Sequence, residues 1–263
     1  MRRHAAPAAL LSLGLLAWTA IASAVPSAAI SPPASSQATR QDAALSRLAS
    51  CVRERRALAV LILMDESGSL HRSDPGDQRV RAAQVAIDGL GHLVDPDLTE
   101  PPVKVEIALA SFARKFDVGA WRDLVIASDE IKREIAGFAA RDDGDATDYV
   151  LALDRAREVL SEQAGAVTRG GGRAPCQALI WFTDGRYEPV GADSPPPVVD
   201  RGRHQLCDAG GVVDQLRASN AAVLTVALAG ELNQPEEEFL RDITGRPGGS
   251  CGANASAGGG HYV

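Results

Sequence analysis

The sequence predicts an α/β fold: a doubly wound, mostly parallel central sheet with helices on both faces and one short antiparallel edge strand. Strand-like and helix-like segments alternate through most of the chain, which is typical of parallel strands joined by crossover helices. Two strands, at residues 58–64 and 178–182, are apolar at every position, as strands buried on both faces are. We expect these two strands to be adjacent at the centre of the sheet.

The remaining strands are shorter or alternate in polarity. Val103, Val105, Ile107 and Leu109 alternate with other residues and predict a strand that continues to about residue 113. The short edge strand is expected at residues 115–121. Further strands are expected at residues 221–230 and 259–263.

Helices are expected where apolar residues recur every three or four positions. The first follows Asp74 or Asp77, either of which can cap it, and runs to about residue 94. A second is expected from Ser128 or Asp129 to residue 140. Others are expected at residues 147–163, 210–220 and 235–245, with a glycine-rich loop at 164–176.

The first residues of the chain have the features of a secretory signal peptide, which we place at residues 1–24. Arg2 and Arg3 precede an apolar stretch, and the small residues at 22–24 form a cleavage signature. An uncleaved membrane anchor is the alternative, but the stretch is short and is interrupted by Pro7 and Gly14. Residues 25–41 are rich in proline, serine and alanine and predict a disordered linker, which leaves 42–263 as the folded domain.

Charge and hydropathy limit the classes of partner. The formal net charge is −7, and loss of the two arginines in the signal peptide would make it −9, which argues against a nucleic-acid partner. No further apolar stretch is long enough to span a membrane, so no transmembrane span is expected in the mature chain. Abundant Ala, Arg, Gly and Pro with little Lys is typical of a GC-rich bacterial genome. We therefore expect a secreted or cell-surface protein outside the cytoplasm.

The chain has four cysteines, Cys51, Cys176, Cys207 and Cys251. An even number in an exported chain favours two disulfides. No C-x-x-C pair is present, so the spacing matches no zinc site. Three connectivities are open, and we favour Cys51 with Cys251 and Cys176 with Cys207.

Both central strands end in an acid. The first continues into "DESGS", residues 65–69, and the second into "TDG", residues 183–185. In a doubly wound sheet the ligand crevice lies beyond the carboxyl ends of the strands, so Asp65 and Asp184 should meet there. Two carboxylates without a basic neighbour repel each other unless a cation lies between them. Carboxylates and hydroxyls are also the oxygen ligands that hard cations prefer.

These residues resemble the von Willebrand factor type A domain, the fold shared with integrin inserted domains. "DESGS" looks like the D-x-S-x-S signature of that family, Thr147 stands before a central helix, and Asp184 follows the next core strand. Three matching segments are more specific than any single motif. The resemblance implies a metal-ion-dependent adhesion site with five metal-binding residues: Asp65, Ser67, Ser69, Thr147 and Asp184.

The resemblance also implies the cofactor and the partner. Mg²⁺ suits a site with few direct protein contacts and retained waters; Mn²⁺ would fit as well and Ca²⁺ less well. An open coordination position would bind a Glu or Asp carboxylate of a protein ligand, which makes the chain an exported adhesion or assembly module. Glu66 should face solvent, while Asp143, Asp145 or Asp148 could accept hydrogen bonds from metal-bound water.

The sequence departs from the family at two places. The family's domain usually ends in a helix, and no helix follows residues 259–263. Either the chain is a fragment of a longer protein, or the helix-like residues 42–55 cover the same face. The proline-rich loop after Asp184, residues 186–207, either shapes partner choice or is a tolerated insertion.

The sequence leaves two other functions open. A hydrolase could use Ser67 or Ser69 with His71, but no G-x-S-x-G motif is present and His71 is too close in sequence to act easily as their base. We therefore expect no enzyme. A metal-independent structural module of a larger cell-envelope protein is the other alternative, and the complete set of five site residues argues against it.

Overall fold

A central sheet organises the described part of the chain in the computed structural model, which comprises residues 35–95, 101–228, 232–245, 251 and 261–262. Side chains are described from residue 45 onward, except in the last strand. The predicted signal peptide and residues 25–34 of the predicted linker lie outside this part. The predicted division into signal peptide, linker and domain therefore stays a prediction.

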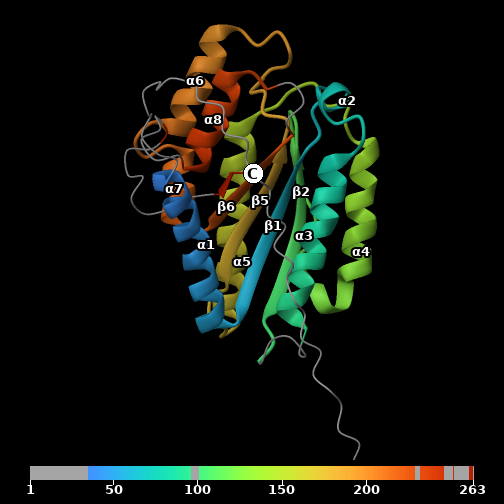
Figure 1. The fold of residues 1–263 in the computed structure, drawn as a ribbon, viewed down its shortest axis with the longest axis vertical. Helices are drawn as coiled ribbons and strands as arrows, with labels where there is room; N and C mark the ends of the chain where they lie inside the picture. The colour runs from blue at the N-terminus through green and yellow to red at the C-terminus, as the bar shows by residue number, and fades with distance from the viewer. Residues whose placement is uncertain (1–34, 96–100, 229–231, 246–250, 252–260, 263) are drawn as a thin grey trace, which may run out of the picture. The chain divides into compact units, whose positions relative to one another are not determined.

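The sheet has the predicted mostly parallel architecture (Figure 1). Its strands lie in the order β3-β2-β1-β5-β6-β7, and both β3 and the short β4 pair with β2 in antiparallel orientation. β1 lies between β2 and β5 and is parallel to both, so the two apolar strands are central neighbours as predicted. The strands are β1 Ala57–Asp65, β2 Lys104–Phe112, β3 Phe116–Val118, β4 Arg122–Asp123, β5 Cys176–Thr183, β6 Ala222–Ala227 and β7 His261–Tyr262.

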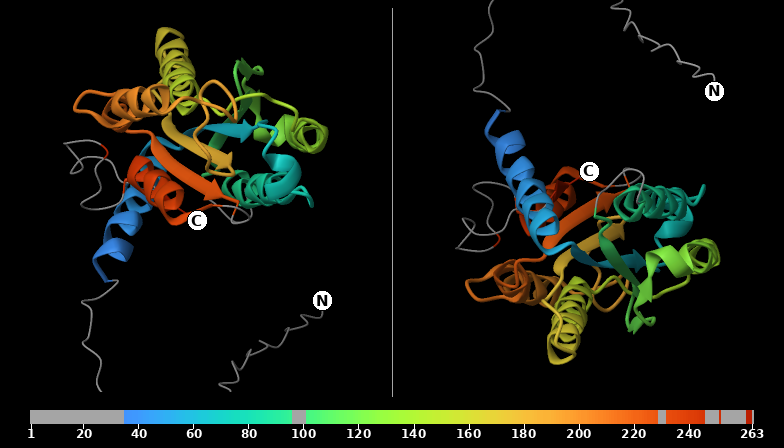
Figure 2. Two further views of the ribbon diagram at one scale, coloured as in Figure 1. Left: turned by 90° about the horizontal axis from the view of Figure 1, so that it is seen from above. Right: turned by 90° about the horizontal axis from the view of Figure 1, so that it is seen from below.

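Helices cover both faces of the sheet, as the two end-on views show (Figure 2). Alternate residues of β1 belong to two different hydrophobic clusters: Leu61 and Leu63 to the cluster that includes α5, and Ile62 and Met64 to the cluster that includes α3 and α4. The helical elements are α1 Ser35–Arg55, α2 Leu70–Ser73, α3 Gln78–Val94, α4 Leu124–Gly137, the 3-10 turn η1 Phe138–Ala140, α5 Tyr149–Arg169, α6 Pro196–Cys207, α7 Val212–Ala218 and α8 Gln234–Thr244.

Three element predictions need correction. α4 begins at Leu124 and is capped by Asp123, whose side chain accepts a hydrogen bond from the Val125 N–H, rather than by Ser128 or Asp129. The proline-rich loop contains a helix, α6, because prolines fit the first turn of a helix, where the N–H groups have no partner. α1 begins at Ser35, so the helix-like segment expected at residues 42–55 starts seven residues earlier.

The N-terminal helix packs against the sheet. α1 contacts β5, β6 and β7, and Val52 belongs to the same cluster as α3 and α4. This is the arrangement expected if residues 42–55 cover the face that the family's terminal helix usually occupies. None of the described helices is long and apolar enough to cross a membrane.

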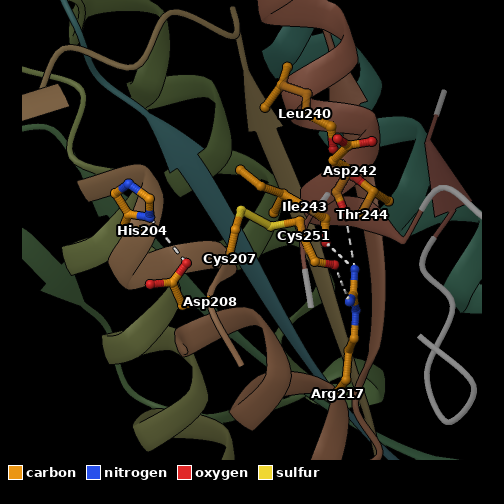
Figure 3. Close-up of a disulfide and its surroundings, with 9 residues drawn as sticks. All are labelled: His204, Cys207, Asp208, Arg217, Leu240, Asp242, Ile243, Thr244 and Cys251. Atoms are coloured by element: carbon orange, nitrogen blue, oxygen red, sulfur yellow. Dashed lines mark hydrogen bonds and ion pairs between the residues drawn. A yellow bond between two sulfur atoms is a disulfide. The ribbon is translucent and has the colours of Figure 1, made fainter. Parts of the chain in front are cut away.

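Two disulfides are present, as expected, but the favoured connectivity is wrong. Cys51 pairs with Cys176, and Cys207 pairs with Cys251 (Figure 3). The first joins α1 to the start of β5, which are 125 residues apart in sequence, so spacing along the chain gave no indication of it. Beside the second, Arg217 donates hydrogen bonds to the carbonyls of Cys251 and Asp242, which holds this region to α7.

The disulfide connectivity gives a direct prediction. Peptide mapping of the non-reduced exported protein should find the Cys51–Cys176 and Cys207–Cys251 linkages and no free thiol. Replacing Cys51 and Cys176 together by serine should lower the free energy of unfolding by about 2–4 kcal/mol in urea titrations, because the disulfide closes a long loop. A peptide that links Cys51 to Cys251 would contradict the structure.

Candidate metal centre

The centre of the site lies where β1 and β5 end side by side. The register pairs Met64 with Phe182, so Asp65 comes next to Thr183 and Asp184. Thr183 donates its hydroxyl hydrogen to Asp65 Oδ2 at 2.6 Å. The sequence prediction that these two strand ends share one crevice agrees with this geometry, and both acids are buried.

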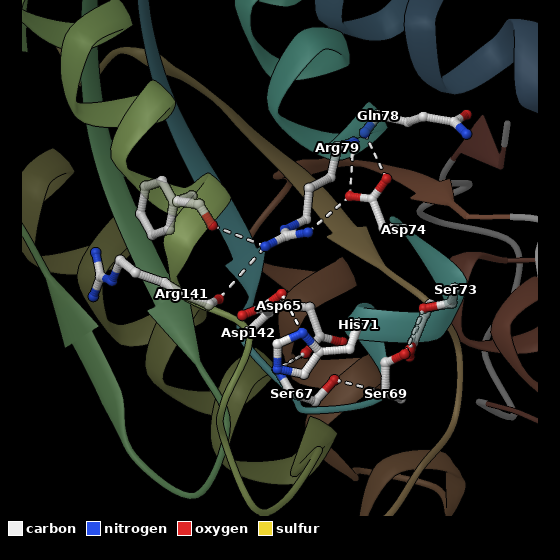
Figure 4. Close-up of polar contacts among 12 residues, drawn as sticks. Asp65, Ser67, Ser69, His71, Ser73, Asp74, Gln78, Arg79, Arg141 and Asp142 are labelled. Carbon is white, nitrogen blue, oxygen red and sulfur yellow. Dashed lines mark hydrogen bonds and ion pairs between the residues drawn. The ribbon is translucent and has the colours of Figure 1, made fainter. Parts of the chain in front are cut away.

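The "DESGS" loop folds back over the end of β1 (Figure 4). The Ser67 N–H donates to Asp65 Oδ1 at 2.8 Å, and the Ser67 and Ser69 hydroxyl oxygens lie 3.0 Å apart. α2 begins directly after Ser69. The two hydroxyls are therefore close neighbours, and the Asp65 carboxyl holds the backbone of the same loop.

Thr147 is brought to the site by backbone pairing. The Gly68 N–H donates to the Gly144 carbonyl at 2.7 Å, and the Gly144 N–H donates to the Glu66 carbonyl at 2.9 Å. On its other side, Thr147 exchanges two backbone hydrogen bonds with Glu188. Thr147 thus lies between two loops that follow β1 and β5. Sequence reasoning missed Gly144, because a glycine in an acidic loop carries no signal of its own.

Asp184 is held by a residue that the sequence did not indicate. The Ser73 hydroxyl, at the end of α2, donates to Asp184 Oδ2 at 2.9 Å, and Ser73 is buried. Ser73 lies outside the D-x-S-x-S signature, so motif matching passes over it. Through this contact Ser73 positions the Asp184 carboxylate.

The electrostatics of the pair follow from burial. Burial raises the pKa of the Asp65 carboxyl to about 7, and the nearby Asp184 acts in the same direction. Hydrogen bonds from Thr183 and Ser67 favour the charged form and offset part of this increase. A buried acid whose charged form is disfavoured by a neighbouring acid is a suitable environment for a cation.

The donor set fits a hard divalent cation. Ser67, Ser69 and Thr147 line one cavity of about 160 Å³. Thr147 Oγ1 and Asp184 Oδ1 are buried and have no hydrogen-bond partner, although buried polar atoms are nearly always paired. Within the described residues, no group of three or more His, Cys, Asp or Glu side chains is placed to hold a metal, so a metal here would depend on the hydroxyls.

A buried ion pair supports the loops around the site (Figure 4). Arg79 and Asp74 side chains are fully buried, with Nη1 and Oδ2 2.8 Å apart. Arg79 Nη2 also donates to the Phe138 carbonyl at 2.8 Å. Arg141 lies 2.6 Å from Glu66, whose side chain is only 16% exposed. The prediction that Glu66 faces solvent is therefore wrong.

The other candidate side chains have different partners. Asp148 caps α5 by accepting hydrogen bonds from the N–H groups of residues 150 and 151, and Asp145 is exposed and bonded by Arg114. His71 Nδ1 lies 3.0 Å from Asp142 Oδ2. These contacts give Asp142, Asp145 and Asp148 structural roles.

Comparison with known families decides the identity of the fold. Residues 60–186 match the family model of the von Willebrand factor type A domain. The chain is a von Willebrand factor type A domain protein. The matched segment of this von Willebrand factor type A domain includes most of β1, all of β2 and β5, and all five predicted metal-binding residues. No curated protein sequence matches the chain.

The solved structure of a bacterial pilin shows the same fold, and a pilus adhesin is a weaker match. The minor pilin PilB from Streptococcus sanguinis has a TM-score of 0.54 at 11% identity, over 79% of this chain and 56% of that chain. The pilus adhesin SpaC from Lactobacillus rhamnosus GG has a TM-score of 0.48 at 15% identity, over 76% of this chain and 29% of that chain. This von Willebrand factor type A domain protein thus spans less than two thirds of the length of either.

Proposed function

We propose that the chain is an exported, metal-dependent protein-binding module of the adhesion or assembly type. Asp65, Ser67, Ser69, Thr147 and Asp184 would hold one divalent cation. The observation that carries the proposal is the pair of buried oxygens without partners, Thr147 Oγ1 and Asp184 Oδ1, in a site that already contains a second buried acid. Membership of the von Willebrand factor type A family supports the same function.

The residue types favour Mg²⁺. Three hydroxyls and two carboxylates leave room for water ligands, which Mg²⁺ retains readily; Mn²⁺ is also suitable, whereas Ca²⁺ prefers more oxygen ligands at longer distances. When bound, such a cation supplies a position for a carboxylate oxygen of a Glu or Asp on a partner protein. The buried residues around Asp65 and Asp184 would orient these two carboxylates. They would also provide a low-dielectric environment, which strengthens the attraction between the carboxylates and the cation.

The neighbouring contacts support binding rather than hydrolysis. A serine nucleophile needs a base within hydrogen-bond reach, yet among the described residues the Ser67 hydroxyl bonds to that of Ser69 and no hydrogen bond joins His71 to either serine. A location outside the cytoplasm is supported by the two disulfides, which persist in oxidising compartments.

The proposal predicts metal-dependent capture of acidic ligands. The exported chain should bind Mg²⁺ or Mn²⁺ in calorimetric titrations, and random peptides displayed on phage and selected in Mg²⁺ should elute with EDTA and be enriched in Glu or Asp. The Asp65→Ala, Asp184→Ala double variant should lose both properties, because it lacks both carboxylates.

Two single variants compare a residue of the site with a control residue outside it. Ser67→Ala should weaken metal binding and peptide capture, whereas Ser161→Ala, at an exposed position of α5, should leave both unchanged. Circular dichroism should show that every variant is folded. Equal metal uptake by the wild type and the double variant would refute the proposal and favour the metal-independent structural module.

A further inference from the structure

A cavity of about 380 Å³ lies at the opposite edge of the sheet from the candidate metal centre. Its walls come from α1, from the residues that lead into β5 and β6, and from the ends of α5 and α7. β1, β5 and β6 are parallel, and the candidate metal centre lies beyond the carboxyl ends of β1 and β5. The cavity is at the amino ends of β5 and β6. Cavities that hold small organic molecules measure about 300–1,000 Å³, so this one is large enough for such a ligand.

The described residues that line this cavity include three arginines and no acid. Arg47 and Arg55 belong to α1, and Arg217 belongs to α7. Arg55 Nη1 donates to the Ala174 carbonyl at 3.1 Å. Arg217 is buried and donates to three backbone carbonyls (Figure 3). Carbonyl groups carry no net charge, so these contacts position the guanidinium groups without neutralising them.

The acids near these arginines lie outside the cavity. Burial lowers the pKa of Arg217, whereas the charges of Asp214 and Asp242 raise it, each with a smaller effect. Neither acid lines the cavity, and Asp214 Oδ2 accepts a hydrogen bond from the Gly210 N–H. Glu54, on α1, forms an ion pair with Arg173. A negatively charged group inside the cavity would therefore stabilise the charged form of Arg217.

The contacts of Arg47 give it no structural role. Arg55 and Arg217 lie in the last turns of their helices, where a positive charge is favourable. Arg47 lies away from the ends of α1 and is exposed. No hydrogen bond or ion pair joins its side chain to another residue in the part of the chain that the structure describes. The Arg47 guanidinium can thus bind a ligand without breaking a contact of this part of the chain.

The rest of the wall is rigid and partly apolar. The Cys51–Cys176 disulfide lines the cavity and ties α1, which carries Arg47 and Arg55, to the start of β5. Leu48, Pro175 and Ala221 add aliphatic surface. A covalently fixed wall reduces the conformational freedom that is lost when a ligand binds.

We propose that this cavity binds a small organic anion. Its carboxylate or phosphate group would contact Arg47 and Arg55, and its apolar part would lie against the aliphatic wall. Guanidinium groups bind carboxylates and phosphates through paired, charge-assisted hydrogen bonds. Arg217 adds a fixed positive charge to the same cavity. This site is separate from the candidate metal centre, so binding requires no divalent cation and does not depend on the proposed function.

The test uses hexanoate and hexyl phosphate as probes and neutral hexanol as their comparison. Saturation-transfer NMR and calorimetry on the disulfide-bonded exported chain, in EDTA and at constant ionic strength, should detect binding of the anions. Hexanol should bind more weakly than either anion that binds. If one anion binds and the other does not, the result supports the site and identifies the acidic group that it prefers.

Three variants locate the binding. In the Arg47→Gln, Arg55→Gln double variant the affinity for the anions should fall about 10-fold or more, because charged hydrogen bonds are lost. Arg53→Gln is the matched control, since Arg53 is exposed on α1, bonds to Ser50 and does not line the cavity. It should bind the anions as wild type does, and so should the Asp65→Ala, Asp184→Ala variant.

Circular dichroism should show that each of these variants is folded. Equal affinity of the wild type and the arginine double variant would overturn the inference, as would hexanol binding as tightly as the anions. So would the absence of binding by both anions. Loss of anion binding in the Asp65→Ala, Asp184→Ala variant would also overturn it, because the anion would then bind at the candidate metal centre.

Discussion

Replacing Arg79 by alanine should lower the free energy of unfolding by about 3–5 kcal/mol, since it breaks a buried ion pair. The change removes the guanidinium from the fully buried Asp74 carboxylate and from the Phe138 carbonyl. Asp74 keeps two backbone N–H donors, from Gln78 and Arg79, but its charge loses the counter-ion. Urea denaturation followed by circular dichroism measures the loss.

The control for Arg79 is Arg155→Ala. Arg155 forms an exposed ion pair on α5, and exposed pairs contribute about 0–1 kcal/mol. The double variant Asp74→Ala, Arg79→Ala should be more stable than the sum of the single changes predicts, because no unpaired charge is left behind. If Arg79→Ala lowers the free energy of unfolding by less than about 1 kcal/mol, the Arg79–Asp74 pair does not stabilise the loops around the site.

Replacing Gly144 by alanine should weaken metal binding about 10- to 100-fold, as other changes to groups that position metal ligands do. An added Cβ would lie 2.6 Å from the Glu66 carbonyl oxygen and 2.5 Å from the Ala113 Cβ. Neither atom is the end of a flexible side chain, so the loops must separate. This moves Thr147 away from Ser67 and should also reduce stability by about 1–3 kcal/mol.

The matched control is the same substitution in an open position. Gly89 lies within α3, and an added Cβ there meets nothing within 4 Å. Gly89→Ala should raise stability by about 0.5–1 kcal/mol, because glycine disfavours helix interiors, and should leave metal binding unchanged. Mn²⁺ titration and urea denaturation separate the two effects. Wild-type metal affinity in Gly144→Ala would contradict the proposed role of the backbone pairing.

The sheet could be predicted because its signals are local. The apolar strands β1 and β5 and the alternating residues of β2 reveal their burial directly in the sequence. The start of α4 was missed because Val125 and Ile126, in its first turn, are apolar yet exposed, which conceals the helical periodicity. The disulfides were mispaired because each joins segments that only the fold brings together.

In the candidate site, too, some residues could be predicted from the sequence and others could not. The five residues proposed to bind the metal could be named because they follow a family motif with fixed order. Ser73, Gly144 and Arg79 could not, because each acts through a partner 59 to 111 positions away or through a backbone contact. Glu66 was placed in solvent because nothing in the sequence relates it to Arg141.

The pairing of Thr147 with Glu188 has a consequence for how the molecule can vary. These two residues are joined through their main chains, and main-chain hydrogen bonds tolerate many different side chains. Arg186 and Ala192 line the cavity of about 160 Å³ beside Thr147, and we expect that their side chains can change without disturbing the loop that carries Thr147. Randomising these two positions while keeping the five residues proposed to bind the metal should yield a set of domains with one common centre and many different ligand preferences.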